Sequence, residues 1–205
     1  MIAVIDYGVG NLFSLRSSLD AIGAESVVTA DPEIIGKADK IILPGVGAFG
    51  DAIMKLRETG LDAVIKGEVA SGKPIFGICL GMQLLFERSF EYGEHEGLAL
   101  LRGSVVPMDG RIDAGLKIPH IGWNALNVKR EHPLLKYTAD GYHVYFVHSY
   151  FAVDCEDSLI ASSEYGAEIT AMVAKGNVAG AQFHPEKSGD VGLNMLRAFC
   201  EWEGN

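Results

Sequence analysis

The sequence is short of cysteine, of positive charge and of long apolar runs. Its 205 residues include 3 cysteines and 17 Lys+Arg against 27 Asp+Glu, for a formal net charge of −10. Scattered cysteines without a CxxC pair exclude a disulfide framework and a cysteine-based zinc site, and favour a reducing cytoplasm. The negative charge argues against nucleic acid or an anionic membrane as a partner.

The remaining composition is that of a globular protein. Hydrophobic residues make up 48% of the chain and charged residues 21%, which is enough to build one sizeable core. No apolar run approaches the roughly 18 residues that cross a bilayer. The opening residues 1–5 lack a basic flank and meet Asp6 at once, so we expect a strand there and not a signal peptide. Without repeats or a Pro/Ser-rich linker, we expect a single domain over residues 1–205.

The spacing of apolar residues predicts an α/β fold. In the first half, short β-branched runs alternate with amphipathic stretches, which indicates a central, largely parallel sheet flanked by helices. The second half has more closely spaced strands, which predicts antiparallel pieces beside the parallel core. The expected strands are 2–5, 26–29, 40–43, 75–78, 105–108, 125–128, 143–147, 159–162, 169–174 and 178–182. The expected helices are 12–22, 51–70, 82–86 and 191–199.

Cys79 stands between a predicted strand and a predicted helix, in the run Gly77-Ile78-Cys79-Leu80-Gly81. This is the pattern of a nucleophile elbow with sulfur in place of oxygen, because glycines on either side remove side chains that would collide at a sharp turn. The helix N-terminus favours a thiolate, and the Leu80 amide is free to donate to an oxyanion. An isolated cysteine is more often a small buried hydrophobe, but this context favours a nucleophile.

A thiolate nucleophile needs a base that a third group orients. His184 follows a predicted strand, and Pro185 and Glu186 come directly after it. Because Pro185 fixes the chain direction, the Glu186 carboxylate can return to the imidazole and set its tautomer. Alone, this run would as readily be a turn with a solvated acid; together with the cysteine elbow it predicts a triad. For the other histidines we expect structural roles in loops or near strands: His95, His120, His132, His143 and His148.

Three runs in this order resemble the class I, or triad, glutamine amidotransferases: residues 44–47 (PGVG), 77–83 (GICLGMQ) and 182–186 (QFHPE). Within that family the whole chain is similar to the glutaminase subunits of imidazole glycerol phosphate synthases, including residues 6–12 and 119–124 and the run His148-Ser149-Tyr150. The resemblance implies the class I glutamine amidotransferase fold and glutamine as the substrate.

The resemblance also implies roles for the three triad residues. Cys79 would attack the side-chain amide of glutamine, His184 would carry a proton to the departing ammonia, and Glu186 would orient His184. A glutamyl thioester would form, and water would hydrolyse it.

Oxyanion donors are expected from the Leu80 amide and from the loop Gly45-Val46-Gly47. The glycines beside Val46 let its peptide flip at little steric cost. The resemblance implies a glutaminase that is poorly active until its partner holds substrate. We expect that a flip of this peptide then completes the donor, since a missing donor costs about 10²–10³ in rate.

Four residues are expected to bind the glutamine substrate. Gln83 lies one helical turn beyond Cys79 and can face the same pocket, while Glu91, on the loop after that helix, can pair with the ammonium group. Ser149 and Tyr150 stand at a strand end, where they can bind the carboxylate. Without the family resemblance, Gln83 and Glu91 would be solvated surface residues.

Ammonia must reach a second active site without protonation in bulk water, and nothing in the sequence resembles a synthase domain. The Gly8-x-Gly10 run has Phe13 where a dinucleotide fingerprint needs its third glycine. The resemblance implies no cofactor and no metal. It implies a heterodimer with a cyclase subunit, a (β/α)₈ barrel that joins ammonia with a phosphorylated ribulosyl precursor to give imidazole glycerol phosphate and an aminoimidazole carboxamide ribotide. Trp123, in an expected Gly-Trp-Asn turn, is either an interface anchor or a core residue.

Three other functions remain open on the sequence alone. The chain could be the glutaminase of another ammonia-channelling synthase, such as pyridoxal phosphate synthase, although residues 44–47 and 119–124 argue against it. It could be a cysteine peptidase or a related elbow hydrolase, which would not need Gln83 and Glu91. It could also be a regulatory module that retains the fold without catalysis.

Overall fold

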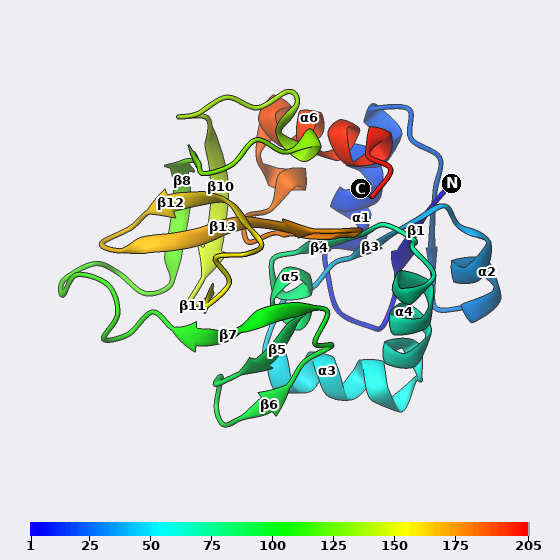
Figure 1. Cartoon of the computed structure of the whole chain (residues 1–205), viewed down its shortest axis with the longest axis horizontal. Coiled ribbons are helices and arrows are strands. Elements are labelled where there is room, and N and C mark those ends of the chain that lie inside the picture. The colour runs from blue at the N-terminus through cyan, green and yellow to red at the C-terminus, as the bar shows by residue number, and fades with distance from the viewer. Residues whose placement is uncertain (205) are drawn as a thin grey trace.

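The computed structural model describes residues 1–204 and shows an α/β fold around an 8-stranded sheet (Figure 1). The strands, in their order across the sheet, are β2 (Ser26–Thr29), β1 (Ile2–Ile5), β3 (Lys40–Leu43), β4 (Ile75–Ile78), β14 (Val178–Ala181), β13 (Glu168–Lys175), β12 (Leu159–Glu164) and β9 (Asn127–Val128). The pairs from β2 to β14 are parallel, and those from β14 to β9 are antiparallel. This arrangement confirms the predicted parallel core with antiparallel strands beside it.

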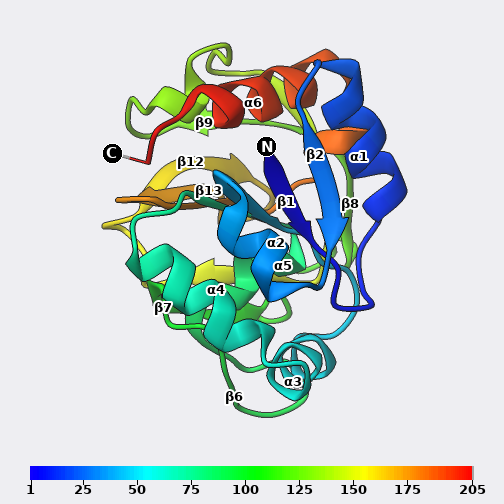
Figure 2. The ribbon, with the colours of Figure 1, turned by 90° about the vertical axis from the view of Figure 1, so that its right-hand side faces the viewer.

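Helices cover both faces of the sheet (Figure 2). On one face lie α1 (Leu12–Ala21) and α6 (Gly189–Glu201), and on the other lie α2 (Pro32–Lys37), α3 (Phe49–Glu58), α4 (Leu61–Ala70) and α5 (Leu80–Leu84). Successive side chains of a strand point to opposite faces. Accordingly, Ile2 and Val4 join the core cluster that contains α1 and α6, while Ala3 and Ile5 join the cluster that contains α3 and α4.

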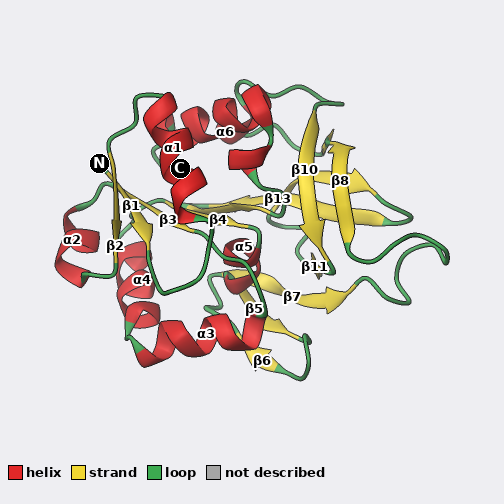
Figure 3. Ribbon diagram, turned by 180° about the vertical axis from the view of Figure 1, so that it is seen from behind, coloured by secondary structure: helices red, strands yellow, loops and turns green. Residues whose placement is uncertain are grey.

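Two smaller sheets extend the second half of the chain (Figure 3). The 4-stranded sheet has the order β11 (Tyr150–Val153), β7 (Leu101–Pro107), β5 (Phe86–Ser89) and β6 (His95–Glu96), and the 2-stranded sheet pairs β10 (His143–His148) with β8 (His120–Ala125). Short 3₁₀ helices occupy Pro133–Leu135 and Pro185–Lys187. In residues 1–204 no helix is long and apolar enough to cross a membrane.

Several predicted boundaries are wrong, each for a local reason. The helix expected over residues 51–70 is two helices, because Gly60 has a φ of +73° and begins α4 from the left-handed region. The helix expected at 82–86 is α5, which begins directly at the elbow, and Phe86 already starts β5. Trp123 lies inside β8 and not in a turn. The sequence pattern missed α2, β5, β6, β8 and β11. The strand expected at 125–128 is instead the last residue of β8 followed by the two-residue β9.

Candidate active site

Cys79 occupies a strained turn between β4 and α5. Its backbone has φ 54° and ψ −112°, a conformation that side chains rarely adopt, and its amide donates to the Ala181 carbonyl of the neighbouring strand at 2.7 Å. A Cβ added to Gly81 would stand 1.8 Å from the Leu43 carbonyl oxygen, and one added to Gly77 would stand 2.6 Å from the Gly81 carbonyl oxygen. The turn therefore requires both glycines, and the predicted elbow is present.

His184 and Glu186 form a buried pair next to this elbow. Nδ1 of His184 lies 2.8 Å from Oε1 of Glu186, and their side chains are 2% and 3% exposed. The short helix at Pro185–Lys187 turns the carboxylate back toward the imidazole, as the proline predicted. Burial alone would lower the pKa of His184, but the nearby Cys79 and the hydrogen bond to Glu186 raise it to about 9. The geometry thus gives His184 Nδ1 an acceptor, while Nε2 has no hydrogen-bond partner within residues 1–204 and His184 shares a cavity wall with Cys79.

One cavity of about 530 Å³ brings most of the predicted site residues together. Its wall contains Cys79 and His184 and, of the other predicted residues, Val46, Gly47, Leu80, Gln83, Glu91, Ser149 and Tyr150. Gly45 and Glu186 are outside this wall and line a small neighbouring cavity behind His184. The sequence reasoning missed further wall residues, namely Tyr92, Pro119, Val147, His148 and Lys187.

The expected oxyanion loop is anchored by Tyr7. The buried Tyr7 hydroxyl donates to the Pro44 carbonyl at 2.8 Å, and burial together with the nearby Cys79 raises the pKa of Tyr7. A Cβ on Gly45 would stand 2.8 Å from that hydroxyl, so only glycine fits there. Gly47 has a φ of +97°, and Val46 between the glycines is 42% exposed. Tyr7 follows β1, and no local pattern indicates its contact with a loop far along the chain.

The sequence predicted that Glu91 lies on the loop after the helix that follows Cys79. In the structure β5 comes between them, and Glu91 lies on the turn after that strand. Its Oε2 accepts the amide hydrogen of Phe49, the first residue of α3, at 2.6 Å. Burial raises the pKa of this carboxyl above its ordinary value, although the hydrogen bond from the Phe49 amide lowers it in part. Glu91 therefore joins the cavity wall to the helix that follows the Gly45-Val46-Gly47 loop.

The Tyr150 carbonyl is a shared acceptor in the cavity wall. Gln83 Nε2 donates to it at 3.0 Å, and His148 Nδ1 lies 2.9 Å from it. His148 Nε2 in turn meets His120 Nδ1 at 3.1 Å. Burial lowers the pKa of His148 to about 3 and that of His120 to about 4, so both are neutral at physiological pH. His120 has the structural role that we predicted, whereas His148 also lines the cavity.

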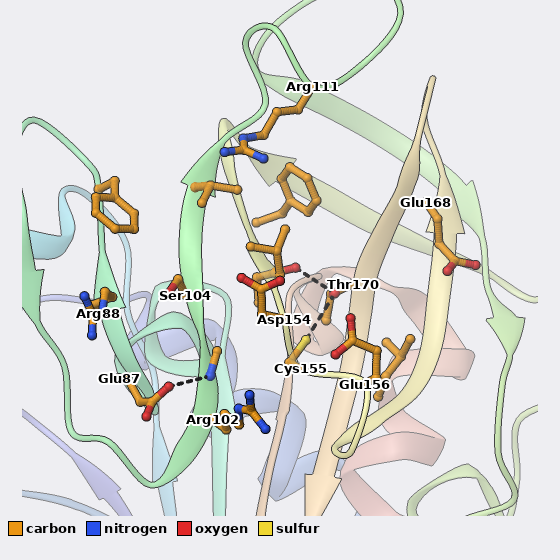
Figure 4. Close-up of a pocket in the computed structure, with 17 residues that line it drawn as sticks. Glu87, Arg88, Arg102, Ser104, Arg111, Asp154, Cys155, Glu156, Glu168 and Thr170 are labelled. Atoms are coloured by element: carbon orange, nitrogen blue, oxygen red, sulfur yellow. Dashed lines mark hydrogen bonds between the residues drawn. The ribbon is translucent and has the colours of Figure 1, made fainter.

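A larger cavity of about 920 Å³ lies between β7, β11 and the β12–β13 pair and contains Cys155 (Figure 4). Its polar wall includes Arg88, Arg102 and Arg111. Cys155 is buried and lies 3.6 Å from the Thr170 hydroxyl, and desolvation raises its pKa to about 11. Since no histidine lines this cavity, Cys155 has no base, and the nucleophile is not there. Within residues 1–204 no group of His, Cys, Asp and Glu side chains is arranged to hold a metal ion.

The chain combines a strained cysteine elbow and a buried His–Glu pair with an α/β sheet, and comparison with known proteins identifies its class. The family model described as "Glutamine amidotransferase class-I" matches residues 3–201. A solved structure entitled "Crystal structure of glutamine amidotransferase" superposes with a TM-score of 0.78 over 100% of both chains, at 21% identity. The chain belongs to the class-I glutamine amidotransferase family.

Relatives that match over their full length indicate a particular member of this family. It is 52% identical over 205 residues to the imidazole glycerol phosphate synthase subunit HisH of Bacillus licheniformis, with 98% of this chain and 96% of that protein covered. It is 50% identical over 202 residues to the HisH subunit of Oceanobacillus iheyensis, with 98% of each covered. The structure of PurLQS from Thermotoga maritima shares the fold, with a TM-score of 0.74 at 22% identity over 98% of this chain and 97% of that chain.

Proposed function

We propose that this chain is the glutamine-hydrolysing subunit of an imidazole glycerol phosphate synthase, acting in histidine biosynthesis. Full-length identity of about 50% to HisH subunits supports this assignment. The observation that carries the chemistry is the buried His184–Glu186 pair, whose His184 lines the same cavity as the strained Cys79. In this proposal the whole of residues 1–205 is one cytoplasmic glutaminase domain.

The reaction follows from these positions. The Cys79 thiolate attacks the side-chain carbonyl carbon of glutamine, and the oxyanion that forms accepts hydrogen bonds from the Leu80 amide and from the Gly45-Val46-Gly47 loop. His184 gives its proton to the departing nitrogen, so ammonia leaves and a glutamyl thioester remains. Water then attacks the thioester, His184 accepts a proton, and glutamate leaves. Glu186 keeps the imidazole in one tautomer through both steps.

The substrate is held by the wall of the cavity. Glu91 pairs with the ammonium group, while Gln83, Ser149 and Tyr150 surround the rest of the amino acid. Both N–H groups of Gln83 are already used, by the Tyr150 carbonyl and by Gln182. Gln83 therefore offers its Oε1 as an acceptor to the substrate.

The ammonia is passed to a separate cyclase subunit, a (β/α)₈ barrel, in a heterodimer. On β8, Ile121 and Trp123 point to the same face and are 58% and 55% exposed. Large apolar side chains that remain exposed together are typical of an interaction surface. Trp123 packs in a T-shaped arrangement against Tyr145 of β10, and because it remains half exposed we expect it to anchor the interface.

Glutamine hydrolysis by the chain, alone and mixed with a cyclase subunit and its nucleotide substrate, tests this function. We expect glutamate release that rises on addition of the loaded cyclase and that Cys79→Ser abolishes. Complementation of a histidine auxotroph lacking its own glutaminase subunit separates this assignment from pyridoxal phosphate synthesis. Undiminished activity of Cys79→Ala in the reconstituted complex would refute the triad, and failure to complement would refute the synthase assignment.

A further inference from the structure

Two buried glutamine side chains connect the cavity wall to the nucleophile. Gln83 Nε2 donates to the Tyr150 carbonyl at 3.0 Å and to Gln182 Oε1 at 3.0 Å. Gln182 Nε2 then lies 3.7 Å from Cys79 Sγ. Gln83 is 5% exposed and Gln182 is 0% exposed, so water does not compete for these groups.

The Tyr150 carbonyl oxygen fixes the direction of every hydrogen bond in this series from Tyr150 to Cys79. A backbone carbonyl can only accept, so Gln83 must turn its NH₂ group toward Tyr150. The second N–H of that group meets the Gln182 amide, which must therefore present its oxygen. Gln182 is left with its NH₂ group facing the sulfur, and the opposite orientation would place oxygen against oxygen or nitrogen against nitrogen.

We propose that Gln182 is a catalytic residue that donates a hydrogen bond to the Cys79 thiolate. The inference rests on Cys79 being the nucleophile of the proposed function. A hydrogen bond to the charged form of an acid favours that form, and an amide donor held in a dry site is already oriented when the charge appears. Gln182 would therefore raise the fraction of Cys79 present as thiolate and limit the positions that the sulfur can take.

The Gln83–Tyr150 contact also links the cavity wall to the orientation of Gln182. Tyr150 belongs to the strand that lines the glutamine cavity, so a shift of its carbonyl would release Gln83 and, through it, the orientation of Gln182. The nucleophile and the wall of the glutamine cavity are thus joined through the side chains of Gln83 and Gln182, neither of which is titratable. His184 lines the same cavity as Cys79, but its hydrogen bond goes to Glu186, so it does not take part in this series of contacts.

The pH dependence of Cys79 alkylation by iodoacetamide tests the proposal in the full chain without partner or glutamine. Mass spectrometry of the Cys79 peptide keeps Cys155 and Cys200 out of the measurement. Gln182→Met removes the donor, and Gln182→Glu places an acceptor against the sulfur. We expect the pH midpoint of alkylation to rise by about one unit in Gln182→Met, which is about tenfold less thiolate at a pH below the midpoint, and further in Gln182→Glu.

Ser163→Ala is the matched control, because it removes another buried hydrogen bond in the same sheet, the one to the Ala125 carbonyl. We expect its alkylation profile to coincide with that of the unmodified chain. Should the Gln182 variants fail to fold, the unmodified chain still gives an answer. Its Gln182 side-chain NH₂ resonances should shift with the ionisation of Cys79, and they should lose that shift in Cys79→Ser.

Coincident alkylation profiles in folded Gln182 variants, or Gln182 resonances that do not respond to Cys79, would overturn the proposal. Neither result would contradict the proposed function of glutamine hydrolysis. Conversely, a chain that failed to hydrolyse glutamine would refute the proposed function, while the effect of Gln182 on the thiol would still be measured.

Discussion

Oε1 of Glu186 lies 2.8 Å from Nδ1 of His184, and both side chains are almost wholly buried. An ionised carboxylate can only accept, so the imidazole carries a proton on Nδ1 and turns Nε2 toward the cavity. In the proposed mechanism, this single contact makes Nε2 the nitrogen that exchanges protons with the sulfur and the leaving group.

Replacing Glu186 by Gln should therefore damage catalysis far more than stability. An amide can offer either oxygen or nitrogen to Nδ1, so the imidazole tautomer is no longer enforced. We expect kcat to fall by about 10²–10⁴-fold with little change in KM. Steady-state glutaminase assays of the complex measure this, and Glu201→Gln, an exposed carboxyl that pairs with Lys136, serves as control. A kcat within threefold of the unmodified enzyme would contradict the orienting role.

The raised pKa of His184 predicts a pH dependence of stability. Because the folded state holds this proton more tightly than the unfolded state, the contribution is complete below about pH 6.5 and is lost as pH rises through about 9. The urea midpoint of the unmodified chain should fall more between pH 6.5 and 9.5 than that of His184→Gln. Cys79→Ser should reduce the difference, since the sulfur contributes to the shift. Parallel curves for all three chains would contradict this expectation.

The parallel core could be predicted almost to the residue. Strands β1, β3 and β4 have the predicted bounds, because strands buried on both faces are largely continuous apolar runs. The half-buried edge strand β2 also has its predicted bounds, through its β-branched residues. The turns at Cys79 and at His184-Pro185-Glu186 were predictable for a similar reason, because both are local patterns whose geometry the backbone dictates.

The contacts that support the triad could not be predicted, because they join distant parts of the chain. Tyr7 and Pro44 are 37 residues apart, and Gln182 and Cys79 are 103 apart. Nothing in a local pattern gives the partner of a tyrosine hydroxyl or of a glutamine amide. His148 was assigned a structural role for the same reason, since its place in the cavity wall depends on how β10 crosses the end of the sheet.

Lys40 should be a strong contributor to stability although it has no role in the site. Its buried Nζ donates to the carbonyls of Phe199 at 3.2 Å and Cys200 at 2.7 Å, and also to that of Trp202, at the C-terminal end of α6. Lys40→Met leaves these carbonyls without their cation, and we expect the free energy of unfolding to fall by about 1–3 kcal/mol. Urea unfolding measures the change. Lys37→Met removes an exposed ion pair with Glu33 and should cost less than about 0.5 kcal/mol; equal losses would contradict the capping role.

Two glycine substitutions should have opposite effects. Gly81→Ala would put a methyl group 1.8 Å from the Leu43 carbonyl oxygen, where backbone cannot move aside, and we expect loss of the folded enzyme or of its activity. Gly67 lies within α4, and a Cβ added there would meet nothing within 4 Å, so Gly67→Ala should stabilise the chain by about 0.5–1 kcal/mol. Thermal unfolding and the glutaminase assay measure both. An active, stable Gly81→Ala enzyme would show that the elbow is not held as the structure has it.

Glu91 should distinguish substrates by their ammonium group. Glu91→Gln keeps an oxygen that can accept the Phe49 amide hydrogen, so α3 and the neighbouring loop should remain in place, but it removes the charge that pairs with the substrate. A charged hydrogen bond contributes about 1.5–3 kcal/mol, so KM for glutamine should rise by at least about tenfold. For 4-carbamoylbutanoate, which lacks the amino group, the two enzymes should have the same KM. If Glu91→Gln weakened both substrates equally, Glu91 would act through α3 and not through the ammonium group; thermal unfolding of the variant would then show the loss of the Phe49 contact.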